Sequence, residues 1–128
     1  MQAYVLVFLG AGIGGALRHG VNVGCARMCG AAFPWGTLTV NVVGSFLMGA
    51  IAAWLAYRSD QEWSQPLRLF LITGILGGFT TFSAFSLDAV LIWERGQMGL
   101  AAAYVAASVV LSIAGLLAGL ALIRTLTA

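Results

Sequence analysis

The sequence contains no lysine, and charged side chains of either sign are rare. Six arginines and four acidic residues make up 8% of its 128 residues, whereas soluble domains average about 25% charged residues. Hydrophobic residues account for 61% of the chain, and a soluble fold of this length could not bury that much apolar surface. The scarcity of charge therefore excludes a soluble domain. It predicts an integral membrane protein that is surrounded by the lipid bilayer and has no nucleic-acid partner.

Side chains that bind metals or carry out catalysis are equally scarce. His19 is the only histidine, and Cys25 and Cys29 are the only cysteines. A metal site needs more ligands than these, and the sequence offers no nucleophile paired with a base. We therefore expect no enzyme, and we interpret the two cysteines as small residues near a membrane interface.

Uncharged runs divide the chain into four segments. A spanning helix needs about 20 mostly apolar residues, and each run provides them. The runs predict an all-α integral membrane fold, a single domain over residues 1–128, with helices at about 3–23, 38–57, 67–93 and 98–123. The first run does not resemble a signal peptide, because Arg18 follows the apolar stretch instead of preceding it.

Arginines are almost evenly divided between the two sides of this topology. With four spans, both termini and the loop after the second helix share one side. That side holds Arg58, Arg68 and Arg124, and the other holds Arg27 and Arg95, with Arg18 at the far end of the first helix. Arginine-rich short loops normally face the cytoplasm, so this balance gives almost no preferred orientation. Either another feature sets the topology, or the protein inserts both ways and pairs as an antiparallel dimer.

Glycines recur at four-residue spacing in the first and fourth predicted helices. Gly10 and Gly14 form one G-x-x-x-G motif, and Gly115 and Gly119 form another. Small residues at this spacing let helices approach closely in lipid. The first helix also contains G-x-G-x-x-G, but a nucleotide site needs an acidic residue about 20 positions later, and the first acid is Asp60. Both motifs therefore predict close helix packing.

Two polar stripes run along the second and fourth helices at four-residue spacing. One comprises Thr37, Asn41 and Ser45, and the other Tyr104, Ser108 and Ser112. Hydroxyl groups in membrane helices often bond only their own backbone, whereas an amide such as Asn41 is costly there unless it is paired. The matched spacing favours a polar track. Hydroxyl and amide donors, together with the weakly positive edges of phenyl rings, would suit a small anion.

The stretch GGFTTFSAFS, residues 77–86, is a poor continuous helix. Two glycines and four hydroxyl residues accompany Phe79, Phe82 and Phe85 at three-residue spacing. Non-helical backbone at membrane depth is tolerated only where it is buried in protein or lines a cavity. A glycine kink relieved by Thr and Ser side chains is the simpler interpretation, but an aromatic stripe among hydroxyls favours a built site. We therefore expect the third helix to be broken mid-membrane, near residues 77–83.

At these positions the sequence resembles the Fluc (CrcB) fluoride channels, over nearly its whole length. The resemblance rests on GTLTVNVVGSF at residues 36–46, TGILGGFTTFSAFS at residues 73–86, Arg18 after a glycine-rich first helix, and the stripe of Tyr104, Ser108 and Ser112. The G-G-x-[ST]-T-F-S-x-F core is its specific part. The resemblance implies a passive fluoride-selective channel in the bacterial inner membrane. Such a channel exports fluoride from the cytoplasm and protects against its toxicity.

The resemblance also implies an assembly and a set of site residues. Members of the family are dual-topology antiparallel homodimers with two fluoride pores and a structural sodium ion at the dimer centre. By motif position, main-chain carbonyls of Gly77 and Thr80 would hold the sodium ion, and Arg18 would be structural. The pore would be lined by Asn41, Phe82, Phe85, Ser83, Tyr104, Ser108, Ser112 and Thr37. The family core often reads F-S-T-F, so Ala84 removes a hydroxyl near the break.

Two other functions stay open at this point. A proton-coupled small-solute carrier would use Asp88 as its proton site. Such carriers usually have a mid-membrane carboxylate, and the first two helices contain none. A non-transporting membrane scaffold would use only the glycine faces.

Overall fold

The structure is a computed structural model that describes residues 1–128, and all its regular elements are helical. α1 covers Gln2–Cys29, α2 covers Trp35–Ala56 and α6 covers Met98–Thr127. Between α2 and α6 lies one long helical segment, Ser64–Glu94. These four helices are each long and apolar enough to cross a membrane. The expected all-α membrane fold with four spanning helices is therefore confirmed.

The segment Ser64–Glu94, called the third segment below, changes its helix type along its length. It consists of α3 (Ser64–Arg68), the π-helical stretch η1 (Leu69–Leu76), the short α4 (Gly77–Phe79) and α5 (Phe82–Glu94). Between α4 and α5, Thr80 and Thr81 are extended, with ψ angles of 157° and 118°. π-Helical turns are rare and are often found near functional sites. Here the π-helical stretch is followed by the short α4 and then by the only interruption of the segment.

The helix ends follow the residues that interrupt a helix rather than the charges. α1 continues past its predicted end near residue 23 and reaches Cys29. The residue that ends the helix is Gly30. Gly30 takes a φ of 78°, which favours glycine, and its N–H bonds the Ala26 carbonyl at 3.0 Å. α2 starts directly after Pro34, whose ring is compatible with a helix start.

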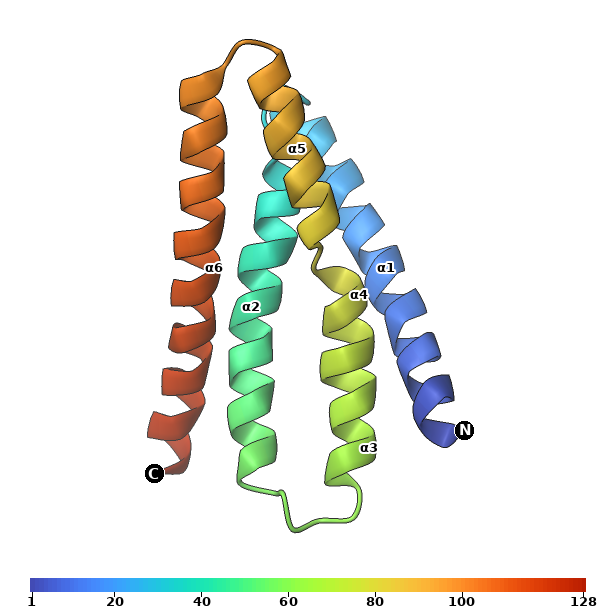
Figure 1. Cartoon of the computed structure of the whole chain (residues 1–128). Coiled ribbons are helices and arrows are strands. Elements are labelled where there is room, and N and C mark those ends of the chain that lie inside the picture. The colour runs from blue at the N-terminus through green and yellow to red at the C-terminus, as the bar shows by residue number, and fades with distance from the viewer.

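α2 lies at the centre of the arrangement (Figure 1). α6 packs along one side of α2, and the third segment lies on the other side. α1 packs on the η1 and α4 parts of the third segment. Both termini and the loop between α2 and α3 lie at one end of the molecule, and the loop between α5 and α6 lies at the other. The four spans thus alternate in direction, as the topology predicts.

The glycines of the two G-x-x-x-G motifs bring backbones together in two helix pairs, which confirms the packing role predicted for them. In the pair of α1 and the third segment, a Cβ on Gly10 would lie 2.6 Å from the Phe70 oxygen, and one on Gly14 would overlap the Ile75 oxygen. In the pair of α2 and α6, a Cβ on Gly119 would overlap the Phe46 oxygen. Because the neighbouring atoms are backbone, they cannot rotate away.

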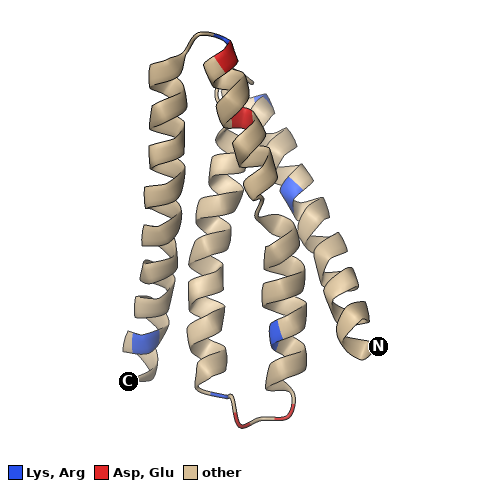
Figure 2. Cartoon of the chain, in the orientation of Figure 1, with Lys and Arg blue, Asp and Glu red and all other residues tan.

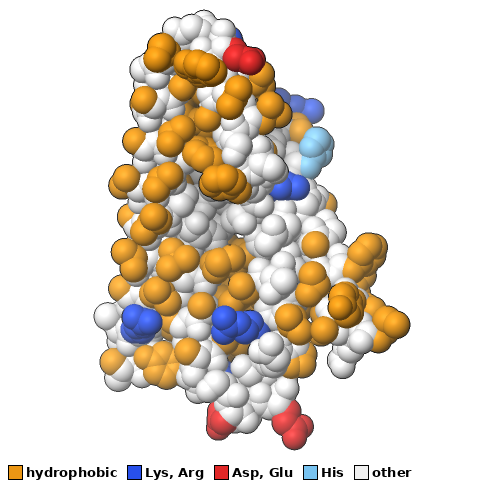
Figure 3. Space-filling model, viewed as in Figure 1, with side chains coloured by type: hydrophobic (Ala, Val, Ile, Leu, Met, Phe, Trp, Pro, Cys, Tyr) orange, Lys and Arg blue, Asp and Glu red, His pale blue; other side chains and the backbone are white.

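The outer surface is apolar, and its charges lie mainly toward the two ends. Hydrophobic side chains cover most of the face in Figure 3, and blue arginine segments occur toward both ends in Figure 2. At the end that carries both termini, the Arg58 guanidinium lies 4.6 Å from the Trp54 ring centroid, and Trp63 packs on Trp54 at 5.8 Å. Aromatic and arginine side chains of this kind anchor helices at a membrane interface.

Candidate pore site

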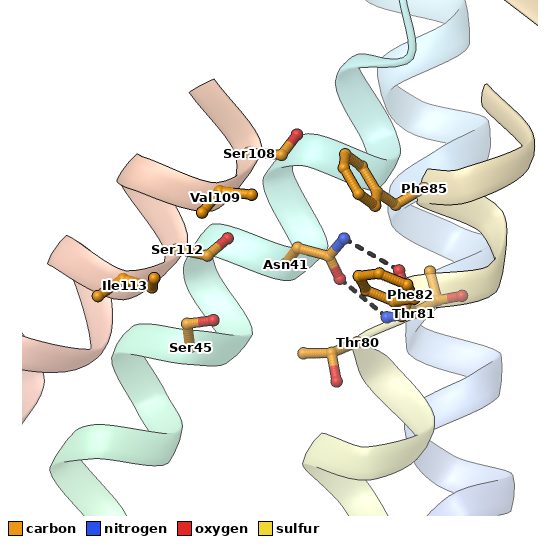
Figure 4. Close-up of a pocket in the computed structure, with 10 residues that line it drawn as sticks. All are labelled: Asn41, Ser45, Thr80, Thr81, Phe82, Phe85, Ser108, Val109, Ser112 and Ile113. Atoms are coloured by element: carbon orange, nitrogen blue, oxygen red, sulfur yellow. Dashed lines mark hydrogen bonds between the residues drawn. The ribbon is translucent and has the colours of Figure 1, made fainter. Parts of the chain in front are cut away.

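A pocket of about 340 Å³ opens between α2, α5 and α6 at the level of the extended residues (Figure 4). It is lined by Asn41, Ser45, Thr80, Thr81, Phe82, Phe85, Ser108, Val109, Ser112 and Ile113. Two residues of each predicted polar stripe therefore line the pocket, Asn41 and Ser45 on α2 and Ser108 and Ser112 on α6. The third wall comes from the interrupted part of the third segment.

Asn41 is tied to the backbone of this interruption. Its Nδ2 donates to the Thr81 carbonyl at 3.0 Å, and its Oδ1 accepts from the Thr81 N–H at 2.8 Å. Both dashed lines in Figure 4 run from this one side chain. The pairing meets the requirement that a buried amide must be satisfied. It also supplies partners for a peptide unit that has left the helical hydrogen-bond pattern.

Thr81 begins α5 with its own side chain. Its Oγ1 accepts from the Ala84 N–H at 3.2 Å and lies 3.4 Å from the Ser83 hydroxyl. A threonine at the N-cap commonly satisfies one of the free N–H groups of the first helical turn. The cap is made without a hydroxyl at position 84, so Ala84 does not prevent α5 from starting here.

Hydroxyl groups around the pocket fall into two kinds. The Thr80 hydroxyl donates to the Leu76 carbonyl, and the Ser86 hydroxyl donates to the Phe82 carbonyl, each at 2.9 Å. In contrast, the buried Ser108 Oγ has no hydrogen-bond partner. Ser45 and Ser112 also line the pocket. A buried hydroxyl without a partner is costly, so Ser108 is a candidate donor to a ligand in the pocket.

Phenyl rings form the side of the pocket next to α5. Phe82 is 79% exposed and Phe85 only 8% exposed, and their ring centroids are 5.5 Å apart. Phe85 continues into a buried aromatic cluster, because the Tyr104 ring lies 5.3 Å from it. The edge of each ring is weakly positive and can approach an anion. Phe85 is fixed by packing, whereas Phe82 is open on one side.

Tyr104 lies beyond the pocket on the side of the α5–α6 loop, fully buried, and donates to Asp88 Oδ2 at 3.2 Å. Thr37 and Ser108 lie close to the same phenol oxygen. Of these four polar residues only Ser108 lines the pocket itself. The polar stripe on α6 therefore continues past the pocket into a polar cluster that contains the half-buried carboxylate of Asp88.

The remaining residues predicted for the site lie outside the pocket. Ser83 is in the first turn of α5 and contacts Thr81. Arg18 is half-buried on α1 and makes no hydrogen bond or ion pair with another side chain. Gly77 ends the π-helical stretch and precedes the interruption. No group of three or more His, Cys, Asp or Glu residues could hold a metal ion.

Four pocket residues were not among the predicted site residues: Ser45, Thr81, Val109 and Ile113. Ser45 belongs to the polar stripe of α2, so its four-residue spacing from Asn41 is a signal that could have included it. Val109 and Ile113 each follow a predicted serine by one position, and apolar residues at such positions carry no signal of their own.

Comparison with known proteins gives a consistent result. Residues 5–120 match the family described as CrcB-like protein, Camphor Resistance (CrcB). Over 124 residues the chain is 58% identical to the "Fluoride-specific ion channel FluC 2" of Nitrobacter hamburgensis, covering 97% of this chain and 98% of that one. It is 60% identical over 126 residues to the "Fluoride-specific ion channel FluC" of Rhodopseudomonas palustris, covering 98% of this chain and 100% of the relative. A protein of the same name from Granulibacter bethesdensis is 55% identical over 128 residues, with 98% of each chain covered.

Proposed function

Because the chain belongs to the CrcB-like family, we propose that it is a fluoride-selective channel. It is a passive membrane channel and not an enzyme. It exports fluoride from the bacterial cytoplasm across the inner membrane and so protects the cell against its toxicity. The family relationship decides between the channel and the two alternatives, a proton-coupled carrier and a scaffold.

One observation carries the proposal: a single pocket brings together the Asn41 amide, the Ser108 hydroxyl and the rings of Phe82 and Phe85. Fluoride is small and strongly hydrated, so a pathway must replace its water with hydrogen-bond donors. The pocket offers neutral donors and no fixed positive charge. Neutral donors can bind an anion weakly enough to release it, which conduction requires.

The pathway we propose follows the polar groups along α6 and α2. It is lined by Asn41, Phe82, Phe85, Ser83, Tyr104, Ser108, Ser112 and Thr37, with Arg18 in a structural role outside it. In this proposal the extended residues Thr80 and Thr81 would lie at mid-membrane depth. Non-helical backbone is tolerated there where it lines a cavity, and both residues line the pocket.

The working unit is an antiparallel homodimer with two pores and dual topology. Two features of the single chain support this assembly. Phe82 at the pocket is 79% exposed. In a single chain nothing covers the outer face of this ring, and a second subunit would close the pathway on that side. The arginines are also nearly balanced between the two ends, so neither orientation is strongly preferred.

A structural sodium ion would lie at the centre of the dimer. Sodium is a hard cation that prefers oxygen ligands, and main-chain carbonyls released by an interrupted helix can provide them. The chain fits this requirement at Gly77 and Thr80. In a continuous helix the Gly77 carbonyl would accept from the Thr81 N–H, and the Thr80 carbonyl from the Ala84 N–H. In the structure the Thr81 N–H bonds Asn41 and the Ala84 N–H bonds the Thr81 hydroxyl instead. When bound, the ion would supply positive charge between the two subunits.

Efflux from liposomes tests the function directly. Purified protein is reconstituted, and fluoride and chloride release are followed in parallel with ion-selective electrodes. We expect fast fluoride release with little chloride release. Release of neither anion from protein shown to be a folded dimer would refute the channel.

The dual topology has a separate test. A protease-sensitive tag is placed after Ala128, and its accessibility is measured on both faces of the native membrane. We expect about half of the tags on each face, because nearly balanced charges give no strong preference. Tags on one face only would rule out the antiparallel assembly.

A further inference from the structure

The hydrogen bonds of Asn41 have the geometry of a strand partner. Thr81 is extended, with φ −153° and ψ 118°, so its N–H and C=O point to the same side. The carboxamide of Asn41 accepts from that N–H at 2.8 Å and donates to that C=O at 3.0 Å. One side chain on α2 thus holds both polar groups of a single residue in the third segment.

This pairing has a consequence for a carbonyl one turn earlier. In a continuous α-helix the Thr81 N–H would bond the Gly77 carbonyl. A backbone N–H is a single donor, and that of Thr81 is directed to Asn41. The Gly77 carbonyl therefore lacks its helical partner because of Asn41.

The same diversion occurs at the second carbonyl. The Thr80 carbonyl would accept from the Ala84 N–H in a continuous helix, but that N–H bonds Thr81 Oγ1 at 3.2 Å. The Leu76 carbonyl, one residue before Gly77, shows the contrast. It is satisfied twice, by the Thr80 N–H at 3.0 Å and the Thr80 hydroxyl at 2.9 Å. Side chains thus bind the N–H groups that would otherwise pair with the Gly77 and Thr80 carbonyls, the two proposed to bind the cation. The Leu76 carbonyl, in contrast, keeps its hydrogen bonds.

The geometry points to Asn41 and the Thr81 hydroxyl as positioning residues for the cation site. Asn41 keeps the Gly77 carbonyl free for a sodium ion, and Thr81 Oγ1 does so for the Thr80 carbonyl. This inference rests on the proposed function, since it names what prepares the sodium site. Neither side chain touches the ion; each removes a competing N–H donor from a carbonyl that does.

Asn41 therefore links two sites. It lines the pocket proposed for fluoride, and its carboxamide fixes the backbone that would bind the cation. An asparagine amide has two N–H donors, and the Thr81 carbonyl takes one of them. The second N–H remains for an anion, so one side chain serves the anion pathway and the cation site at once.

The test is the dependence of thermal stability on sodium. A ligand that binds the folded state raises Tm according to its concentration relative to Kd. Tm of the purified dimer is measured while sodium replaces N-methylglucamine at constant ionic strength. We expect the wild-type Tm to rise with sodium. In Asn41→Ser, which leaves the Thr81 N–H free to return to Gly77, the midpoint should move to about tenfold higher sodium, the effect of about one lost hydrogen bond.

Two matched variants separate this effect from the loss of a polar side chain. Asn41→Asp keeps an oxygen that accepts the Thr81 N–H, whether or not the carboxyl group is protonated. A carboxylate would also attract a nearby cation, so the sodium midpoint of this variant should not rise above that of the wild type. Ser45→Ala removes a hydroxyl from the same helix and the same pocket without touching the interruption, and should leave the midpoint unchanged.

A second pair of variants, at Thr81, tests the Thr80 carbonyl. This test holds even if Asn41→Ser fails to fold. Thr81→Val removes the hydroxyl that bonds the Ala84 N–H, whereas Thr81→Ser keeps it. We expect a weaker sodium response in Thr81→Val only. Equal midpoints for Thr81→Val and Thr81→Ser, or a wild-type midpoint in Asn41→Ser, would overturn the positioning role. A wild-type Tm that ignores sodium would overturn the cation site as well, while the liposome assay would still decide the channel function separately.

Discussion

Replacing Gly119 by alanine tests the close approach of α2 and α6. A Cβ at this position would lie 2.8 Å from the Ala50 nitrogen and would overlap the Phe46 oxygen. Ordinary contacts begin near 3.4 Å, so the two backbones would have to move apart by at least about half an ångström. Overpacking of this kind usually costs about 1–3 kcal/mol. Since the opposing atoms are backbone and cannot rotate away, we expect a loss of about 2–3 kcal/mol for Gly119→Ala.

The assay is unfolding of the purified protein in mixed detergent micelles, followed by far-UV circular dichroism. Gly99→Ala is the matched control, because Gly99 lies on the same helix with no atom within 4 Å of an added Cβ. We expect the control to be as stable as the wild type or slightly more stable, since alanine favours a helix. If Gly119→Ala and Gly99→Ala unfold at the same detergent ratio, the proposed backbone contact does not exist.

A double variant sharpens this prediction. A Cβ on Gly49 of α2 would overlap the Leu116 oxygen of α6, so Gly49→Ala pushes apart the same two helices as Gly119→Ala. Once the helices have separated, the second substitution costs less, and the double variant should lose less stability than the sum of the singles. Gly10→Ala acts on the α1 contact instead, so its effect should add to that of Gly119→Ala.

Two further predictions concern transport, and a third concerns stability. Phe82→Ile and Phe85→Ile should each reduce fluoride efflux at least about tenfold with the dimer intact, because an aliphatic side chain has no positive edge. Full efflux in both variants would show that the rings have no part in the mechanism. Asp88→Asn should leave fluoride efflux independent of a pH gradient, as measured in liposomes with imposed gradients, since a passive channel needs no proton site; pH-coupled uptake that Asp88→Asn abolishes would favour a carrier. Tyr104→Phe should destabilise the fold by about 1 kcal/mol in the detergent assay, because it removes the hydrogen bond to the half-buried Asp88 carboxylate. Unchanged stability would show that the bond to Asp88 contributes nothing.

The sequence predicts the helices because hydrophobic runs and charges act locally. It also predicts that Asn41 needs a partner, since an unpaired amide in lipid is costly. It does not predict which partner. The Thr81 backbone is 40 residues away, and no spacing rule connects an asparagine in one helix to an extended residue in another.

Helix pairing shows the same limit. The G-x-x-x-G motif at Gly115 and Gly119 predicts a close neighbour, but only the structure identifies that neighbour as α2, where Gly49 completes the contact. The π-helical stretch is missed entirely, because nothing in LFLITGIL favours one hydrogen-bond spacing over another. In the structure, η1 packs mainly on α1 and also contacts α2.

The contacts of the G-x-x-x-G glycines pair helices that do not follow one another along the chain. α1 packs mainly on the third segment, and α2 packs mainly on α6. During synthesis at about 5–20 residues per second, α1 and α2 therefore wait in the bilayer for several seconds before either partner emerges. Throughout that time their glycine faces are covered only by lipid or by each other. Assembly can be completed only when the last helix has entered the membrane, because a chain truncated before α6 leaves α2 without its main partner.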